Sequence, residues 1–175
     1  FRLSLAYGLR AEEVAKEKTD GGIWNNLGQI LQIFGHLDVA LEYFEKSLED
    51  NKKQANSQGE GVMLNNISQI HKVRGDYDTA LRYLEQSLKI RQEIGDRQGE
   101  GTTLNNISQI YDAKGDYDTA LRYLEQSLKI RQEIGDRQGE STTIGNIASI
   151  FRAKGDLESA LAFFYKDLHI CQEIG

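Results

Sequence analysis

Side-chain amides recur at an interval of 40 residues along this sequence. The repeated amides are Asn25, Asn26, Gln29, Asn65, Asn66, Gln69, Asn105, Asn106, Gln109 and Asn146. A primary amide both donates and accepts hydrogen bonds, so a row of amides can bond to the backbone of a peptide irrespective of the peptide's side chains. The pattern therefore indicates binding and not reaction, with these amides as candidate contacts.

One position beside the amides changes its charge from repeat to repeat. The residues at that position are Gln32, Lys72, Asp112 and Arg152. We expect Lys72, Asp112 and Arg152 to decide which peptide is preferred, because charge across an interface gives specificity more than raw affinity. A structural role stays open for one set of amides, which can also tie neighbouring helices together. That set is Asn26, Asn66, Asn106 and Asn146.

The spacing patterns of the common catalytic and metal sites do not occur. His36, His71 and His169 stand at non-equivalent places in different repeats, which does not suit a shared metal site. The zinc-peptidase helix motif, the paired-cysteine motif, the phosphate-binding loop and the nucleophile elbow do not occur in the sequence. We therefore expect no enzymatic activity, no metal and no cofactor.

Composition narrows the class of partner. The 175 residues include 27 acidic and 21 basic side chains, which gives a net charge of −6. That charge repels phosphate backbones and anionic headgroups, so we expect neither nucleic acid nor membrane as a partner. The lone Cys171 fits a reducing compartment, and no apolar stretch has the length of a membrane span, so a cytoplasmic location is expected.

The amides belong to a longer internal repeat. Residues 75–100 and 115–140 are identical, and the full repeats 61–100 and 101–140 differ at six positions out of 40. Repeats 21–60 and 141–175 carry the same pattern with more substitutions. Positions are counted here from the first residue of each repeat, so Asn65 and Asn105 both stand at position 5. Self-similarity of this kind is typical of arrays in which each repeat buries its apolar face against its neighbours.

Gly-Asp pairs divide each repeat into two helices. Gly115-Asp116 and Gly135-Asp136 lie twenty residues apart. Glycine accepts the left-handed conformation that ends a helix, and aspartate caps the next one, so two helices of at most 18 residues are expected in each repeat. Apolar and small residues at helical spacing form one buried stripe in each helix. The predicted stripes are Leu104, Ile107, Ser108 and Tyr111 in one helix, and Tyr117, Ala120, Leu121, Leu124 and Leu128 in the next.

The pattern resembles the tetratricopeptide repeat. Its signature positions hold Trp24, Leu27, Gly28, Leu31, Ala40 and Phe44 in the first full repeat. The signature proline is missing, and the period of 40 resembles the longer repeats of kinesin light chains, spindle-orientation adaptors and bacterial peptide-sensing regulators. The resemblance implies an all-α, right-handed superhelical α-solenoid of antiparallel helix pairs. Its repeats would be 21–60, 61–100, 101–140 and 141–175, after a partial helix of a preceding repeat at 1–18.

The resemblance also implies a function. The leading hypothesis is a protein-protein interaction scaffold that binds a peptide segment of a partner in a concave groove lined by the amides. Two alternatives are a structural self-assembling repeat element and the sensor half of a larger signalling protein. Apolar residues of the last helix, among them Phe163, Phe164, Leu168 and Ile170, further predict end-to-end self-association.

Overall fold

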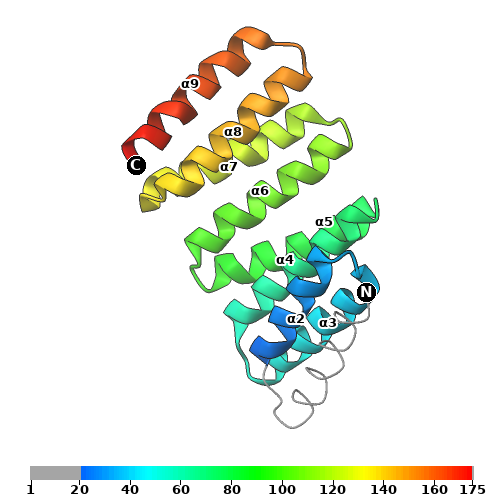
Figure 1. Ribbon diagram of the computed structural model, residues 1–175. Helices are drawn as coiled ribbons and strands as arrows, with labels where there is room; N and C mark the ends of the chain where they lie inside the picture. The colour runs from blue at the N-terminus through cyan, green and yellow to red at the C-terminus, as the bar shows by residue number, and fades with distance from the viewer. Residues whose placement is uncertain (1–20, 175) are drawn as a thin grey trace. The chain divides into compact units, whose positions relative to one another are not determined.

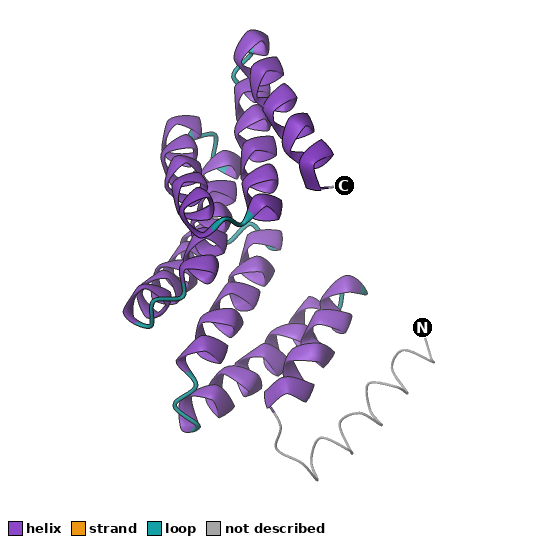
Figure 2. Cartoon of the chain, turned by 90° about the vertical axis from the view of Figure 1, so that its left-hand side faces the viewer, coloured by secondary structure: helices purple, strands orange, loops and turns teal. Residues whose placement is uncertain are grey.

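The computed structural model describes residues 21–174, which are helical between short loops and contain no β-strand (Figures 1 and 2). The helices are α2 (Gly21–Ile33), α3 (Leu37–Lys53), α4 (Ser57–Val73), α5 (Tyr77–Glu93), α6 (Arg97–Ala113), α7 (Tyr117–Ile134), α8 (Arg137–Ala153) and α9 (Leu157–Ile174). The all-α prediction and the limit of 18 residues per helix are confirmed. The helix expected over 1–18 lies outside the described residues.

Each 40-residue repeat contributes two helices. We call the first helix of each repeat A-type (α2, α4, α6 and α8) and the second B-type (α3, α5, α7 and α9). The two helices of a repeat pack against each other in the pairs α2·α3, α6·α7 and α8·α9, and each of α3 and α7 also contacts the A-type helix that follows it. The chain divides into two compact units, Phe1–Tyr83 and Leu84–Gly175, and this division falls within α5.

The predicted Gly-Asp signals end and begin the helices. Gly115 and Gly135 have φ angles of 77° and 70°, in the left-handed region that glycine adopts without steric cost. Asp116 then accepts a hydrogen bond from the backbone N–H of Thr119 at 3.1 Å, as the N-cap of α7. Asp136 accepts in the same way from Gly139 at 2.9 Å, as the N-cap of α8.

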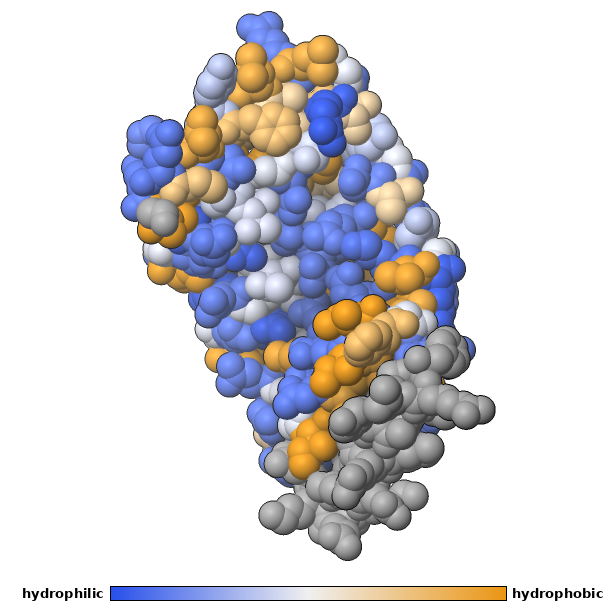
Figure 3. Space-filling view, in the orientation of Figure 1, coloured by the Kyte–Doolittle hydropathy of each residue, from blue (hydrophilic) through white to orange (hydrophobic). Residues whose placement is uncertain are grey.

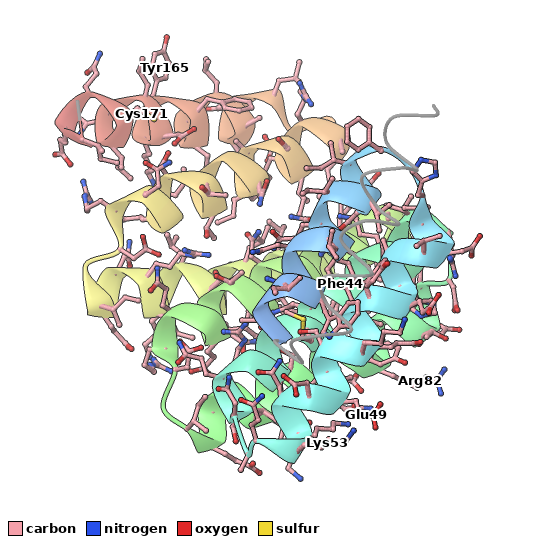
Figure 4. The ribbon with its side chains drawn as sticks, turned by 60° about the horizontal axis from the view of Figure 1, so that its bottom comes forward. Phe44, Glu49, Lys53, Arg82, Tyr165 and Cys171 are labelled. Atoms are coloured by element: carbon pink, nitrogen blue, oxygen red, sulfur yellow. The ribbon has the colours of Figure 1, made fainter. Side chains whose placement is uncertain are left out.

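The core of the first unit lies between α3 and α4. Ala40 and Phe44 of α3 are buried against three apolar residues of α4, which are Met63, Ile67 and Ile70. Phe44 also reaches α2, where a Cβ atom on Gly28 would stand 2.6 Å from the phenyl ring (Figure 4). Glycine at this position therefore admits the bulk of Phe44 between the two helices of the repeat.

The second unit repeats this arrangement. Ala120 and Leu124 of α7 are buried against Ile147 and Ile150 of α8. Other members of the predicted α7 stripe, among them Leu121, pack around this cluster and are half-buried. The stripes read from the sequence thus face the neighbouring helices as expected.

An arginine that resembles a surface residue in the sequence is buried at the junction of α7 and α8. Arg131 donates from Nη1 to Asp136 Oδ2 at 2.5 Å and from Nε to Ser127 Oγ at 3.3 Å. Its side chain passes over the first turn of α8, where a Cβ atom on Gly139 would lie 1.6 Å from Nη1. Arg91, Asp96 and Gly99 form the same arrangement at the start of α6.

Candidate functional site

The position-5 amides are buried or half-buried on their A-type helices. Asn65 and Asn105 are each 6% exposed, and Asn25 is half-buried. Gly145 holds this position in α8, so the amide row stops there. The sequence predicts these amides as peptide contacts in a groove, whereas Asn65 and Asn105 have little exposed surface. Within the second unit, α8 bonds to the side-chain oxygen of Asn105.

Position-6 amides join neighbouring A-type helices. In the first unit, Asn66 of α4 donates from Nδ2 to Asn25 Oδ1 of α2 at 2.9 Å. In the second unit, Asn146 of α8 donates to Asn105 Oδ1 of α6 at 3.0 Å. These bonds match the structural role that the sequence leaves open. Each bond uses one N–H of the donor amide, whose carbonyl oxygen can still accept.

The other amides lie along the same helices. Asn26 and Gln29 are exposed on α2, and Gln69 is half-buried on α4. Asn106 and Gln109 are half-buried on α6. Two adjacent A-type helices in each unit thus form a polar strip with graded exposure. We call these residues the amide strip, one strip in each unit. The first-unit strip is Asn26, Gln29, Asn66 and Gln69, and the second-unit strip is Asn106, Gln109, Asn146 and Ser149.

Charged residues at position 12 border the amide strip. Asp112 of α6 and Arg152 of α8 are both exposed, and Lys72 of α4 is half-buried. Neither Asp112 nor Arg152 has an ion-pair partner among residues 21–174. The second unit therefore presents one charge of each sign at the same end of its strip.

Cations at position 14 are used within the array. Lys154, the C-cap of α8, donates to Asp118 of α7 at 2.6 Å, and Arg74, the C-cap of α4, donates to Asp38 of α3 at 2.5 Å. Each pair spans 36 residues of sequence and joins an A-type helix to the preceding B-type helix. These cations therefore serve the packing of repeats, and their charge is balanced before any ligand arrives.

Stacked rings at position 11 and position 23 are a feature that the sequence analysis did not single out. Tyr111 stacks on Tyr123 with ring centroids 5.6 Å apart, and Phe151 stacks on Phe163 at 5.4 Å. Burial, together with the neighbouring Tyr111, raises the pKa of Tyr123 above its ordinary value. His71 takes position 11 in the first unit and stacks on Tyr83 with ring centroids 5.5 Å apart. A ring residue recurs at position 11 as His71, Tyr111 and Phe151, and this recurrence is the sequence signal for a packed ring.

A groove of about 580 Å³ in the second unit was also not predicted. Its apolar lining comes from α7, α8 and α9 and includes Leu128, Ile144, Phe163 and Ile170. The charge at its edge is engaged within the unit, since Arg137 donates to both Glu140 and Glu173. The groove thus combines apolar surface with the cation of Lys166, whose Nζ lies 4.7 Å from the centroid of the Phe163 ring.

The described residues show neither a grouped metal-ligand set nor a membrane-spanning helix. Within residues 21–174, no three His, Cys, Asp or Glu side chains are grouped so that they could hold a metal ion. None of the helices in this part of the chain has the length and apolar composition needed to cross a bilayer.

This chain has the same fold as several solved structures, and it also matches the model of one protein family. The chain is similar to BtubC from P. vanneervenii at 24% sequence identity and a TM-score of 0.77, over 99% of this chain and 72% of that one. It is similar to a Rap protein complexed with Competence and Sporulation Factor at 14% identity and a TM-score of 0.84, over 96% of this chain and 48% of that one. It is similar to a putative kinesin light chain from Podospora anserina with nearly identical TPR-like repeats at 15% sequence identity and a TM-score of 0.69, over 99% of this chain and 93% of that one.

At these identities the likeness shows the fold alone, and the chain spans about half the length of the Rap protein. A comparison with curated proteins found no match. The family model of the tetratricopeptide repeat matches residues 19–93, 59–133 and 102–173, and together these ranges cover nearly all of the sequence. The chain belongs to the tetratricopeptide repeat family.

Proposed function

We propose that this chain is a protein-protein interaction scaffold whose amide strips bind a peptide segment of a partner protein. The observation that carries the proposal is the hydrogen bond between asparagine side chains of adjacent A-type helices, which occurs at equivalent positions in both units. Asn66 bonds to Asn25 in one unit, and Asn146 bonds to Asn105 in the other. Two equivalent polar strips would suit a ligand with a repeating backbone.

The hydrogen bonds between asparagine side chains fix the orientation of the position-6 amides that would bind the peptide. An asparagine tied to the next helix cannot rotate freely, so it would lose little conformational freedom when a peptide arrives. Asn146 keeps a carbonyl oxygen and one N–H for a ligand after its bond to Asn105. In this proposal the position-5 residues act as buried acceptors that orient the position-6 amides, and the position-6 amides contact the peptide together with Gln69 and Gln109.

Position 12 would select among peptides. Asp112 and Arg152 are exposed, stand on adjacent helices and have no ion-pair partner in the described residues. A peptide that carries a basic and an acidic side chain in matching places would satisfy both charges. Like-charge contacts would reject other peptides, so these two residues would set preference more than total affinity.

The relatives add support of a general kind. The Rap protein whose fold is similar was crystallised with Competence and Sporulation Factor, and a related Rap regulator with the Phr* peptide. Those peptides belong to those proteins. For this chain they support only the class of ligand, a peptide held by a tetratricopeptide array.

A selected peptide provides the test. Peptides from a random displayed library would be selected on the full chain, and the best one titrated against variants. We expect Asn146→Ala to weaken binding by about five- to 150-fold, because it removes up to two neutral hydrogen bonds of about 0.5–1.5 kcal/mol each. Arg152→Glu should change which peptides are selected.

The control is Gln126→Ala, which changes an exposed residue of α7. The control should bind the peptide as the parent chain does. Thermal melts run in parallel separate a binding defect from unfolding. If Asn146→Ala stays folded and binds with the parent affinity, the amide strip is not the peptide site.

A further inference from the structure

The last described helix exposes an apolar stripe. Its members recur at intervals of four, three and four residues, and they are Leu157, Leu161, Phe164 and Leu168. Leu161 and Leu168 are 55% and 52% exposed, and Phe164 is 38% exposed. Of the four residues expected from the sequence on an exposed end, Phe163 is half-buried and Ile170 is buried. We call the four exposed residues the α9 stripe.

The same positions of α7 show what covers such a stripe. They hold Tyr117, Leu121, Leu124 and Leu128. Leu124, at the position of Phe164, is fully buried because Ile147 and Ile150 of α8 pack against it. In the first unit, Met63, Ile67 and Ile70 of α4 cover Phe44 of α3 in the same way. The partner of a B-type stripe is therefore an A-type helix with apolar residues at positions 7 and 10, and α4 adds a third at position 3.

Within the described residues, one A-type helix leaves part of that surface open. Positions 3, 7, 10 and 14 of the first full repeat hold an apolar set with the same four, three and four spacing, which is Ile23, Leu27 and Ile30 of α2 and Phe34 directly after it. Ile23 and Leu27 are half-buried. Ile30 is 51% exposed, whereas Ile70 and Ile110 at the same position are fully buried. Phe34 is also exposed, beside the C-terminal end of α2. We call these four residues the α2 stripe.

Figure 3 shows hydrophobic surface over α2 in the first unit and over α9 in the second. Figure 4 shows Tyr165 projecting from α9 on the side away from α8, next to the α9 stripe. Large exposed apolar patches in a folded protein mark interaction surfaces. Each stripe is half of an interface that the chain already builds twice, between α3 and α4 and between α7 and α8.

We propose that the α9 stripe of one chain binds the α2 stripe of a second copy, and that the contact reproduces the packing of α8 on α7. Chain complementarity points to this occupant, because the same molecule exposes a B-type stripe and the A-type stripe that fits it. The contact is heterologous, with different surfaces on the two partners. It uses none of the amide-strip residues and does not depend on peptide binding.

The chemistry of the contact is apolar. At position 14, Arg74 and Lys154 form ion pairs with the preceding B-type helix, whereas the first full repeat has Phe34 at that position. The copy-to-copy contact therefore lacks this ion pair and gains a phenyl ring. Apolar association is not screened by salt, so high ionic strength should leave the assembly intact.

Sedimentation velocity of the full chain, from micromolar to millimolar concentration, tests the proposal. The weight-average sedimentation coefficient should rise with concentration at low and at high salt. A chain with Leu161→Glu and Leu168→Glu should not self-associate, and neither should one with Ile30→Glu and Phe34→Glu. Each pair of charges should weaken association at least about tenfold, as truncation of central interface residues does. Gln86→Glu with Gln126→Glu adds the same charge to exposed residues outside both stripes and should change nothing.

Mixing the two defective chains gives the sharpest result. Each retains one intact stripe, so an equimolar mixture should form a one-to-one complex that cannot grow further. Circular dichroism of each variant confirms that it is folded. Self-association of the α2 variant at the parent strength would mean that α9 binds α9, and would overturn the proposal. A parent chain that stays monomeric to millimolar concentration would overturn it too, whatever covers the α2 stripe.

Discussion

Single glycines decide where the charged side chains of this array can run. Gly99 and Gly139 stand in the first turn of an A-type helix, beneath the guanidinium groups of Arg91 and Arg131. Any Cβ atom there would displace an arginine that is almost wholly buried and bonded to the N-cap aspartate. Gly101, two residues from Gly99, is different, because a Cβ atom on it would meet its nearest neighbours at 3.6 Å, an ordinary van der Waals distance.

These two glycines should therefore respond in opposite ways to alanine. Gly99→Ala should destabilise the fold by about 1–3 kcal/mol, the usual cost of forcing bulk into a packed site. Gly101→Ala should stabilise it by about 0.5–1 kcal/mol, because glycine is costly inside a helix. Urea unfolding of both variants measures the difference. Adding Arg91→Ala should remove the part of the Gly99→Ala penalty that comes from the guanidinium group, whereas the contact with Asp96 Oδ2 at 2.2 Å would remain. A full penalty in the double variant would refute this explanation.

Residue types and helical spacing predicted part of the candidate site but could not place it fully. The amide rows and the variable position 12 were predicted, and they lie on adjacent A-type helices. The burial of Asn65 and Asn105 was not predicted, because a helical wheel orders residues around one helix and does not locate the next repeat. The same limit applies to Arg131, whose partner Asp136 is near in sequence but belongs to the following helix.

At the scale of helices, the turns depend on N-cap side chains. Asp116 and Asp156 each accept from the backbone N–H of the third residue of the next helix, which is Thr119 in α7 and Ser159 in α9. Bonds from Thr119 and Ser159 hold the pKa of these two carboxyl groups below the ordinary value. In the first unit, Asn56 accepts from Gly59 in the same role without a titrating group. The turn before it uses Ala55 at a φ of 53°, where the other turns have glycine.

The caps predict how stability depends on pH. A carboxyl group with a lowered pKa in the folded chain stabilises the fold above its unfolded pKa, and this contribution is lost as the pH falls through the folded pKa. The parent chain should therefore lose stability in the acid range, below the ordinary pKa of 3.8. Asp116→Asn with Asp156→Asn keeps an acceptor at each cap but removes the titration.

Urea midpoints measured between neutral and acid pH should fall less steeply for this double variant than for the parent chain. Glu45→Gln with Glu125→Gln, at exposed helix positions, is the matched control and should keep the parent slope. Equal slopes for the parent chain and the cap variant would show that the caps do not contribute to acid unfolding.

Helix ends were predictable wherever glycine and aspartate stand together, because both residues act through the local backbone. Contacts between helices were less so. Spacing of four residues suggests that Asp118 pairs with Arg122, yet Asp118 binds Lys154 and Arg122 donates to Thr119. The cation 36 residues away lies closer than the one on the same helix, because stacking of repeats sets that distance. Local sequence therefore predicts where the helices lie, and the repeat period predicts which helices are neighbours.

At the scale of the whole molecule, the two units differ in how well their described helices are covered. α7 packs against α6 on one side and α8 on the other. Within the described residues, α2 packs against α3 and leaves Ile30 exposed. In a repeat array, the stability of each helix is approximately its own term plus the terms of its nearest neighbours. Individual helices should therefore unfold locally, with different opening free energies, before the whole chain unfolds.

Native-state hydrogen exchange at micromolar concentration should resolve this gradient. We expect backbone amides in the middle of α7 to exchange at least about tenfold more slowly than those of α2, which corresponds to about 1.4 kcal/mol of additional opening free energy. α9 should fall between them, because α8 covers one of its sides and the α9 stripe is open.

The variant with Leu161→Glu and Leu168→Glu provides the reference, since it cannot be protected by a second copy. In that variant the order of the three helices should persist at every concentration. In the parent chain, protection of α2 and α9 should rise toward millimolar concentration, while that of α7 stays constant. Uniform exchange of α2 and α7 in the reference variant would mean that the chain unfolds as a single cooperative structure, and nearest-neighbour packing would then not govern its stability.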